Sequence, residues 1–178
     1  EQIKLINDFL TAENKKLREL IDESISSDEI FARVLIDKDS PYLKSVVLNK
    51  GTKDKVKIGM AVIDGAYLVG QIIEVNYTNS RALLLSDLNS KIPSVLAPND
   101  VQTVVSGTGK NYGMIEHTQY VSKKDINEKE RIVYTSGLGG LFKPGIPIGK
   151  MNISSNGIVN FFSDFTQLSY VKIVSYKS

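Results

Sequence analysis

Apolar residues recur at alternating spacings of three and four positions along the first part of the chain. Five of them fall at the core positions of a heptad repeat, the pattern by which two α-helices pack into a coiled coil. They are Ile3, Ile6, Leu10, Leu17 and Leu20, with Glu13 at the remaining core position. No glycine or proline interrupts residues 1–38. We therefore predict a coiled-coil helix over residues 1–27 that joins two copies of the chain in a homodimer.

The same segment carries a second apolar stripe, formed by Leu5 and Phe9, which leaves another arrangement open. An amphipathic helix can instead lay an apolar stripe against its own domain. Serines and an aspartate within residues 24–28 end the helical pattern and form a linker in either arrangement. The two arrangements differ in oligomeric state, because only the first requires a second chain.

Beyond residue 28 the helical period gives way to short runs rich in Val, Ile, Leu and Tyr, a composition typical of β-strands. The runs are residues 31–36, 42–48, 60–63, 67–75, 81–85, 92–96, 101–105, 131–134, 146–151, 157–162 and 168–174. Turn residues separate them, and Asp64-Gly65 between two runs predicts a two-residue hairpin with a type I′ turn. So many short strands indicate a barrel or a sandwich, and the fold class is expected to be mainly β.

Two segments of the β region share the pattern apolar-Lys-x-Gly-apolar-x-apolar, namely residues 56–62 and 142–148. A second apolar-Gly pair follows each pattern, Val69-Gly70 in one case and Ile148-Gly149 in the other. The repetition indicates either two related β-barrels in tandem or two generic turn-into-strand signals. A polar stretch at residues 106–110 is the expected boundary between the two subdomains. We place the first barrel at residues 28–107 and the second at 108–178, with the last strand free to return to the first barrel.

The composition is that of an ordinary globular protein and narrows the possible functions. The 178 residues are 42% hydrophobic and 24% charged, and the net charge of +2 is too small to favour nucleic-acid binding. Without cysteine, the chain can form no disulfide, thiol nucleophile or cysteine-zinc site. One histidine and no D-x-D-x-D-G loop leave no pattern for a metal, and no cofactor motif is found. No apolar run reaches the length of a membrane span, so the chain as given is expected to be soluble.

The segment TSGLGGLFKPGIPIG, residues 135–149, is rich in glycine and raises two catalytic possibilities. A phosphate-binding P-loop needs Gly-Lys-Ser/Thr at the start of a helix, and no helical pattern follows here. A trypsin-like triad of His117, Asp125 and Ser136 would have the right chain order. Only a short polar segment separates the histidine from the serine, and it offers nothing to bury the aspartate. The chain is therefore predicted not to be an enzyme.

The glycines of this segment are predicted to be structural instead. They are Gly137, Gly139, Gly140, Gly145 and Gly149. Glycine adopts positive φ angles without strain and lets two backbones approach closely, as a barrel corner requires. The alternative is that the loop itself is a protein-binding surface, since exposed loops often carry function.

Six sequence motifs, in order along the chain, resemble those of the rod shape-determining protein MreC family. They are LTAENKKL at residues 10–17, VLID at 34–37, GMAV at 59–62 with LVGQI at 68–72, LLSD at 84–87 with Ile92-Pro93, TSGLGG at 135–140 with Phe142 and PGIPIG at 144–149, and SDF at 163–165 with Leu168 and Tyr170-Val171. Residues 111–130 match no part of the family pattern.

This resemblance implies a membrane-anchored scaffold with a dimerising coiled coil and two small β-barrels of six strands each, similar to the chymotrypsin fold without its catalytic triad. It implies a single membrane helix upstream of Glu1 and a position on the periplasmic, extracytoplasmic side of the bacterial inner membrane. The implied partners are the elongation class B penicillin-binding protein, MreD and the actin-like MreB. Two other functions stay open, a trypsin-like-fold hydrolase and a peptidoglycan-binding module.

Overall fold

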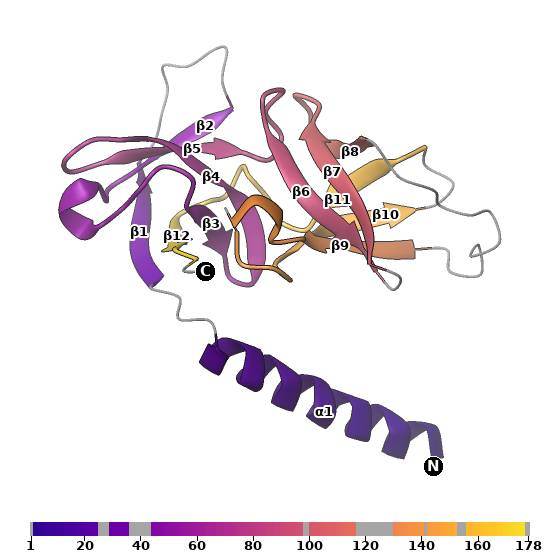
Figure 1. Cartoon of the computed structure of the whole chain (residues 1–178). Helices are drawn as coiled ribbons and strands as arrows, with labels where there is room; N and C mark the ends of the chain where they lie inside the picture. Colours follow the sequence, from indigo (N-terminus) through magenta and orange to yellow (C-terminus); the bar gives the residue numbers. More distant parts are fainter. Residues whose placement is uncertain are drawn as a thin grey trace.

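The chain forms one N-terminal helix and two closed β-barrels of six strands each (Figure 1). The structure is a computed structural model that describes residues 2–24, 29–35, 44–97, 100–116, 130–140, 142–152 and 156–176. The predicted fold class, mainly β with two six-stranded barrels, is confirmed. Each of the eleven apolar runs predicted as strands overlaps a strand of the structure.

The first barrel takes five strands from the first half of the chain and one from its C-terminal end. They are β1 (Glu29–Leu35), β2 (Ser45–Leu48), β3 (Ala61–Asp64), β4 (Tyr67–Val75), β5 (Ser80–Leu84) and β12 (Tyr170–Val174). Around the barrel they follow the order β1-β12-β3-β4-β5-β2, with every neighbouring pair antiparallel. Buried aliphatic side chains such as Val62, Val69, Ile72 and Ile173 fill the interior, as expected for a barrel of this size.

The second barrel is continuous in sequence. Its strands are β6 (Lys91–Leu96), β7 (Val101–Gly107), β8 (Tyr112–Glu116), β9 (Glu130–Thr135), β10 (Pro147–Asn152) and β11 (Ile158–Phe161). They follow the order β10-β11-β8-β7-β6-β9 around the barrel. Strand β8 was not predicted, because its sequence YGMIE lacks the run of Val, Ile and Tyr that marked the other strands.

The chain passes from the first barrel to the second directly after β5, at residues 85–90, and not at the expected boundary of 107/108. The polar stretch at residues 106–110 ends β7 and leads into β8 within the second barrel. Asp87 lies at this crossing between the barrels. Its buried carboxylate accepts hydrogen bonds from the backbone N–H groups of Lys44 (2.8 Å) and Asn89 (2.7 Å). Strand β12 then pairs with β1 and β3 and completes the first barrel.

The two barrels have the same strand order once β12 is counted as the first strand of its barrel. Both then read 1-2-3-6-5-4 around the ring, and β3 corresponds to β9, β4 to β10 and β5 to β11. The pattern shared by residues 56–62 and 142–148 therefore precedes strands that are not equivalent, β3 and β10. That part of the repetition consists of two turn-into-strand signals.

The second apolar-Gly pair does occupy equivalent places, in β4 and β10. Val69 and Ile148 are each the extra residue of a β-bulge, at the register shifts between β3 and β4 and between β9 and β10. The glycine that follows has no room for a Cβ atom, which would collide with the carbonyl oxygen of Leu83 at Gly70 and of Asn160 at Gly149. Both barrels thus use one bulge and one close backbone approach at the same point.

A shared core joins the barrels along β4 and β10. Leu68 of β4 is fully buried in the same cluster as Ile148 and Val159 of the second barrel. Its neighbour Val69 points into the first barrel, so β4 is buried on both faces. At the rim, the rings of Tyr67 and Phe162 lie 4.9 Å apart. A strand buried on both faces shows no alternation of apolar and polar residues, which explains the continuous apolar run at this point of the sequence.

The β3–β4 hairpin was predicted correctly, but its turn differs from the prediction. Asp64 pairs with Tyr67, so the two loop residues are Gly65 and Ala66. Only Gly65, with φ of 60°, is in the positive-φ region. Glycine at the first central position with positive φ there alone is the pattern of a type II′ turn, and not of the predicted type I′ turn.

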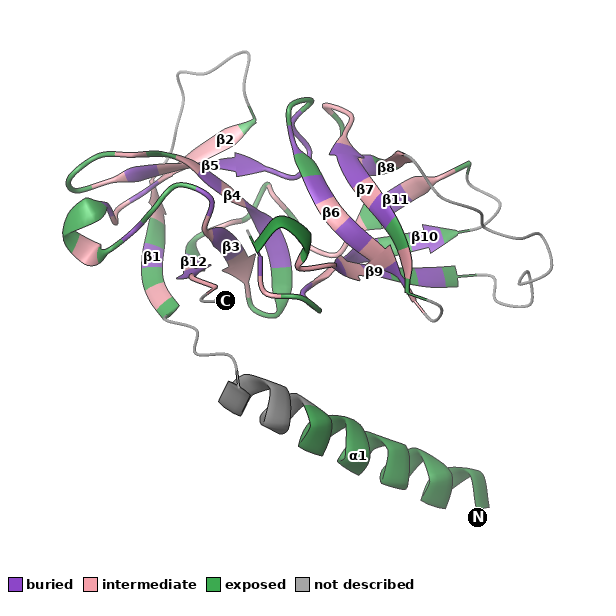
Figure 2. Cartoon of the chain, in the orientation of Figure 1, coloured by how far each residue is buried: buried purple, intermediate pink, exposed green. Residues whose placement is uncertain are grey.

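The helix α1 (Gln2–Ser24) ends where the serine-rich linker was expected to begin. Side chains of residues 2–17 are all exposed, including both apolar stripes (Figure 2). In this structure, therefore, the described side chains of the helix are not packed on the barrels.

Candidate protein-binding site

The loop between β9 and β10, residues 136–146, is the place where the glycine-rich segment lies, and we call it the glycine loop. Since β9 and β10 correspond to β3 and β4, the glycine loop stands where the first barrel has only Gly65 and Ala66. Its tip, Leu138–Gly140, is a tight turn with a left-handed backbone at Gly139 (φ of 80°), and all three residues are exposed. The second barrel has thus added a long connection at a point where its framework needs only two residues.

Thr135, at the end of β9, ties the two ends of the glycine loop together. Its buried hydroxyl donates a hydrogen bond to the carbonyl of Lys143 (2.7 Å) and accepts one from the N–H of Ile146 (2.9 Å). Its backbone carbonyl accepts a further bond from Gly145 (2.9 Å). Phe142 is buried in the core that joins the two barrels. The loop is therefore held at its base while its tip is exposed.

The five glycines singled out from the sequence serve two different structural needs. Gly137, Gly139, Gly140 and Gly145 have φ between 68° and 83°, a conformation that L side chains rarely adopt. A Cβ at Gly139 or Gly140 would meet open space. Gly149 differs, because it lies in β10 and is required by the close approach of Asn160.

Ser136 takes part in a local turn at the start of the glycine loop. Its Oγ accepts a hydrogen bond from the backbone N–H of Leu138 (3.2 Å), which closes a local turn within the glycine loop. The other two members of the considered triad, His117 and Asp125, lie outside the described residues. Among the residues that are described, no group of three or more His, Cys, Asp or Glu side chains could hold a metal ion.

A pocket of about 570 Å³ lies at the mouth of the first barrel, at the end where β1 and β3 begin and β12 ends. Ile30, Ile58 and Met60 line it together with Ser175 and Tyr176, which follow β12. We call it the mouth pocket. Its lining also includes Gly140, so the tip of the glycine loop reaches from the second barrel to the mouth of the first. Barrel mouths are common places for binding sites.

The charged residues at the mouth pocket are mainly cations. Lys55 and Lys57 line it and are exposed, and within the described part of the chain neither has an ion-pair partner. Asp54 also lines the pocket, but it pairs with Lys50 at 3.8 Å and accepts a hydrogen bond from the N–H of Gly51. The sequence analysis did not predict this site. The one signal for it in the sequence is the alternation of lysine with other residues in KGTKDKVK, residues 50–57.

The predicted dimerisation residues form an exposed apolar row on α1. Ile3, Ile6, Leu10 and Leu17 are 78%, 58%, 49% and 51% exposed. The side chain of Leu20 lies outside the part that the structure describes. No helix in the described ranges is both long and apolar enough to cross a membrane.

The SDF motif forms a turn shortly before β12. Asp164 accepts hydrogen bonds through Oδ1 from the hydroxyl of Thr166 (2.6 Å) and from the backbone N–H of the same residue (3.0 Å). These two bonds, the hydroxyl bond most of all, hold the pKa of the Asp164 carboxyl below its ordinary value. The turn redirects the chain from the second barrel toward the first.

Comparisons with known proteins agree with these features. The cell shape-determining protein MreC of Haemophilus influenzae is 36% identical to the chain over 166 residues, which cover 89% of this chain and 45% of that protein. The chain therefore spans less than half the length of this relative.

Two solved structures have the same fold. MreC of Listeria monocytogenes matches with a TM-score of 0.77 at 24% identity, over 99% of this chain and 90% of that one. MreC in a complex with the penicillin-binding protein PBP2 of Helicobacter pylori matches with a TM-score of 0.66 at 14% identity, over 86% of this chain and all of that one.

The model of the family described as rod shape-determining protein MreC, barrel core, matches residues 34–175. This range contains every strand of the structure except the first residues of β1. The chain therefore belongs to the MreC family of rod shape-determining proteins.

Proposed function

We propose that the chain is a non-enzymatic scaffold of the bacterial cell-wall elongation machinery, which maintains cell shape by self-association and by binding peptidoglycan-synthesis partners. The observation that carries the proposal is membership of the MreC family, together with a family member that is found in a complex with PBP2. By this proposal, the partner of the chain is the elongation class B penicillin-binding protein of the same organism. MreD and MreB are further partners, reached directly or through other members of the machinery.

The described surface of the molecule supports a binding function. The exposed features are of the kind that bind proteins, namely an apolar row on a helix and a pocket with apolar and basic lining. The proposal includes a periplasmic position, in which these surfaces would face the enzymes that act on the cell wall.

Binding to the transpeptidase is tested by biolayer interferometry with the chain immobilised and the extracytoplasmic domain of the same organism's elongation transpeptidase in solution. Saturable binding at micromolar or lower concentration is the expected result. A domain of an unrelated periplasmic enzyme of similar size and charge is the control. Equal signals from the two domains would contradict the proposal.

Self-association through α1 is tested by sedimentation velocity on the double variant Leu10→Asp with Leu17→Asp. The wild-type chain is expected to be a dimer and the variant a monomer, because each substitution places a charge in the apolar seam of the coiled coil. Thr11→Asp with Lys15→Asp is the matched control, since both positions lie outside that seam. A wild-type chain that is monomeric at tens of micromolar would contradict dimerisation by this segment alone.

A further inference from the structure

We propose that the mouth pocket is a docking site for an extended, acidic segment of a partner protein, which places an apolar side chain on Ile58 and carboxylates beside Lys55 and Lys57. The inference rests on the scaffold function proposed above and adds to it the place and the chemistry of one contact. The occupant is a protein segment, and the arguments concern apolar area, charge and rigidity in turn.

The apolar part of the pocket centres on a side chain that the fold leaves in water. Ile58 is 70% exposed although it lies directly before the buried residue Gly59. The turn around it is fixed by the hydrogen bond from Gly59 N–H to the carbonyl of Ile72 (2.8 Å) and by the positive φ of 93° at Gly59. Met60 and Ile30 extend this apolar surface into the pocket. An apolar side chain from a partner would remove this area from water.

The charge of the pocket selects an acidic occupant. Lys55 and Lys57 flank the buried Val56, and both face solvent without an ion-pair partner among the described residues. The one carboxylate of the lining, Asp54, is already engaged by Lys50 and by the N–H of Gly51. Two unpaired cations beside an apolar surface complement a segment that alternates carboxylate and apolar side chains. A phosphate-rich polymer would use the lysines alone and leave Ile58 in water.

The loop that carries Lys55 and Lys57 is held in place by close packing and by backbone hydrogen bonds. Gly51 packs so closely on the backbone of residues 76–79 that it has no room for a Cβ. Thr52 and Lys53 donate backbone hydrogen bonds to the carbonyls of Asn76 (2.9 Å) and Tyr77 (3.1 Å). Lys55 is held in the left-handed region, with φ of 67°. A site whose geometry is fixed in advance loses less entropy on binding than a flexible one.

The glycine loop supplies the far wall of the pocket. Gly140 has no side chain to fill the space beside it, and a Cβ built there would touch nothing within 4 Å. The wall is therefore backbone, which leaves the mouth of the first barrel open to an extended chain. The long connection between β9 and β10 would thus form part of a binding site, which a two-residue turn is too short to do.

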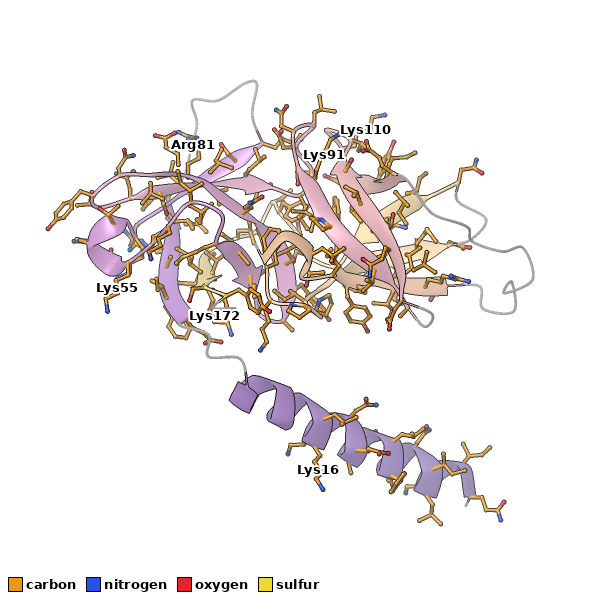
Figure 3. The ribbon with its side chains drawn as sticks, in the orientation of Figure 1. Lys16, Lys55, Arg81, Lys91, Lys110 and Lys172 are labelled. Carbon is orange, nitrogen blue, oxygen red and sulfur yellow. The ribbon has the colours of Figure 1, made fainter. Side chains whose placement is uncertain are left out.

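The experiment compares two pairs of matched variants in the interferometry assay with the transpeptidase domain. The double variant Lys55→Glu with Lys57→Glu is expected to bind at least about ten-fold more weakly, and Ile58→Ser about five-fold more weakly. Lys110→Glu with Lys15→Glu is the control for charge, because neither lysine lines the mouth pocket and Lys110 lies on the second barrel, away from Lys55 (Figure 3). Leu88→Ser is the control for apolar exposure, since Leu88 is 70% exposed, as Ile58 is.

A photo-cross-linking amino acid at position 58 identifies the occupant by mass spectrometry. Cross-links to a transpeptidase peptide that contains aspartate or glutamate are expected. Cross-links to a second copy of this chain, or pocket variants that bind as tightly as the controls, would overturn the inference and leave the scaffold function standing. No binding by the wild-type chain would overturn the proposed partnership, and the inference with it.

Discussion

The β3–β4 connection of the first barrel and the β9–β10 connection of the second stand at equivalent places but differ in nearly every respect. The first is a two-residue turn, Gly65 and Ala66. The second is the glycine loop, residues 136–146, tied at its base by Thr135 and exposed at its tip. The strands on either side follow the same ring order and carry the same bulge. The comparison teaches that the two barrels share one framework, whereas the proposed binding features lie in connections that differ between them.

A second difference concerns how each barrel is closed. The second barrel consists of strands that follow one another in sequence. The first barrel is closed by β12, which comes after all strands of the second barrel in the sequence. Removal of residues 167–178 is expected to have the largest effect, because it should affect the first barrel and not the second. Without β12 the first barrel loses the buried Val171 and Ile173 and the pairing of both β1 and β3, so it opens.

Hydrogen-exchange mass spectrometry measures this loss strand by strand. Amides of β3 and β4 are expected to exchange at the rate of an unfolded chain, while those of β6 and β7 keep most of their protection. Full-length protein is the control. Loss of protection in both barrels together would show that the shared core along β4 and β10 makes them one cooperative unit.

The two strand glycines test whether the barrels are truly equivalent. Gly70→Ala and Gly149→Ala each drive a methyl group into a backbone carbonyl of the neighbouring strand, at Leu83 and Asn160. Each substitution is expected to lower the free energy of unfolding by about 2–4 kcal/mol, with similar values for the two. Urea denaturation measures the difference. A cost at one glycine and none at the other would show that the bulges are not equivalent.

Substitutions of the turn glycines are expected to lower the free energy of unfolding by less, because only the backbone conformation is unfavourable for a side chain at these positions. Gly139→Val faces open space, but φ of 80° is unfavourable for a β-branched residue. We expect a loss of about 1–2 kcal/mol. Gly65→Ala, with φ of 60° and equally open surroundings, should cost about 1 kcal/mol in the same urea experiment. Unchanged stability of Gly139→Val would refute the structural role of that glycine.

The smallest expected effect concerns the turn formed by Asp164 and Thr166, shortly before β12. Thr166→Val removes the hydroxyl that donates to Asp164, so the pKa of Asp164 should rise toward its ordinary value. Any stability that comes from the lowered pKa is complete at neutral pH and is lost as the pH falls through the folded-state pKa. NMR titration of the Asp164 carboxyl measures the shift. Thr52→Val, far from this turn in sequence, is the control and should leave the pKa of Asp164 unchanged.

The sequence was sufficient for most elements and for the mainly β class because their signals are local, whereas the two six-stranded barrels were expected from the family resemblance. The heptad spacing marked α1, and runs of Val, Ile and Leu marked the strands. Strand β8 escaped because Gly113 and Met114 interrupt its pattern; the glycine is needed where a Cβ would meet the Phe161 ring at 2.8 Å. The transfer between barrels at Asp87 could not be predicted, because the polar stretch after β7 looked like a boundary and strand pairing is set by tertiary contacts.

The candidate site was only half visible in the sequence. The glycine loop was prominent in the sequence, and an interaction role for it was considered. That its tip reaches the mouth of the other barrel depends on how β4 packs against β10, which no local pattern encodes. No functional role was predicted for Lys55 or Lys57. Their significance comes from the exposed Ile58 next to them and from the absence of an ion-pair partner within the described residues.

The late position of β12 in the chain sets the order in which the molecule can be completed during synthesis. All strands of the second barrel precede residue 170 in the sequence. The second barrel can therefore form as soon as β11 has left the ribosome, at a stage when the first barrel still lacks β12. The mouth pocket, whose lining includes Ser175 and Tyr176 directly after β12, cannot form before the first barrel closes. A partner that binds this pocket would therefore recognise only chains in which the first barrel is closed.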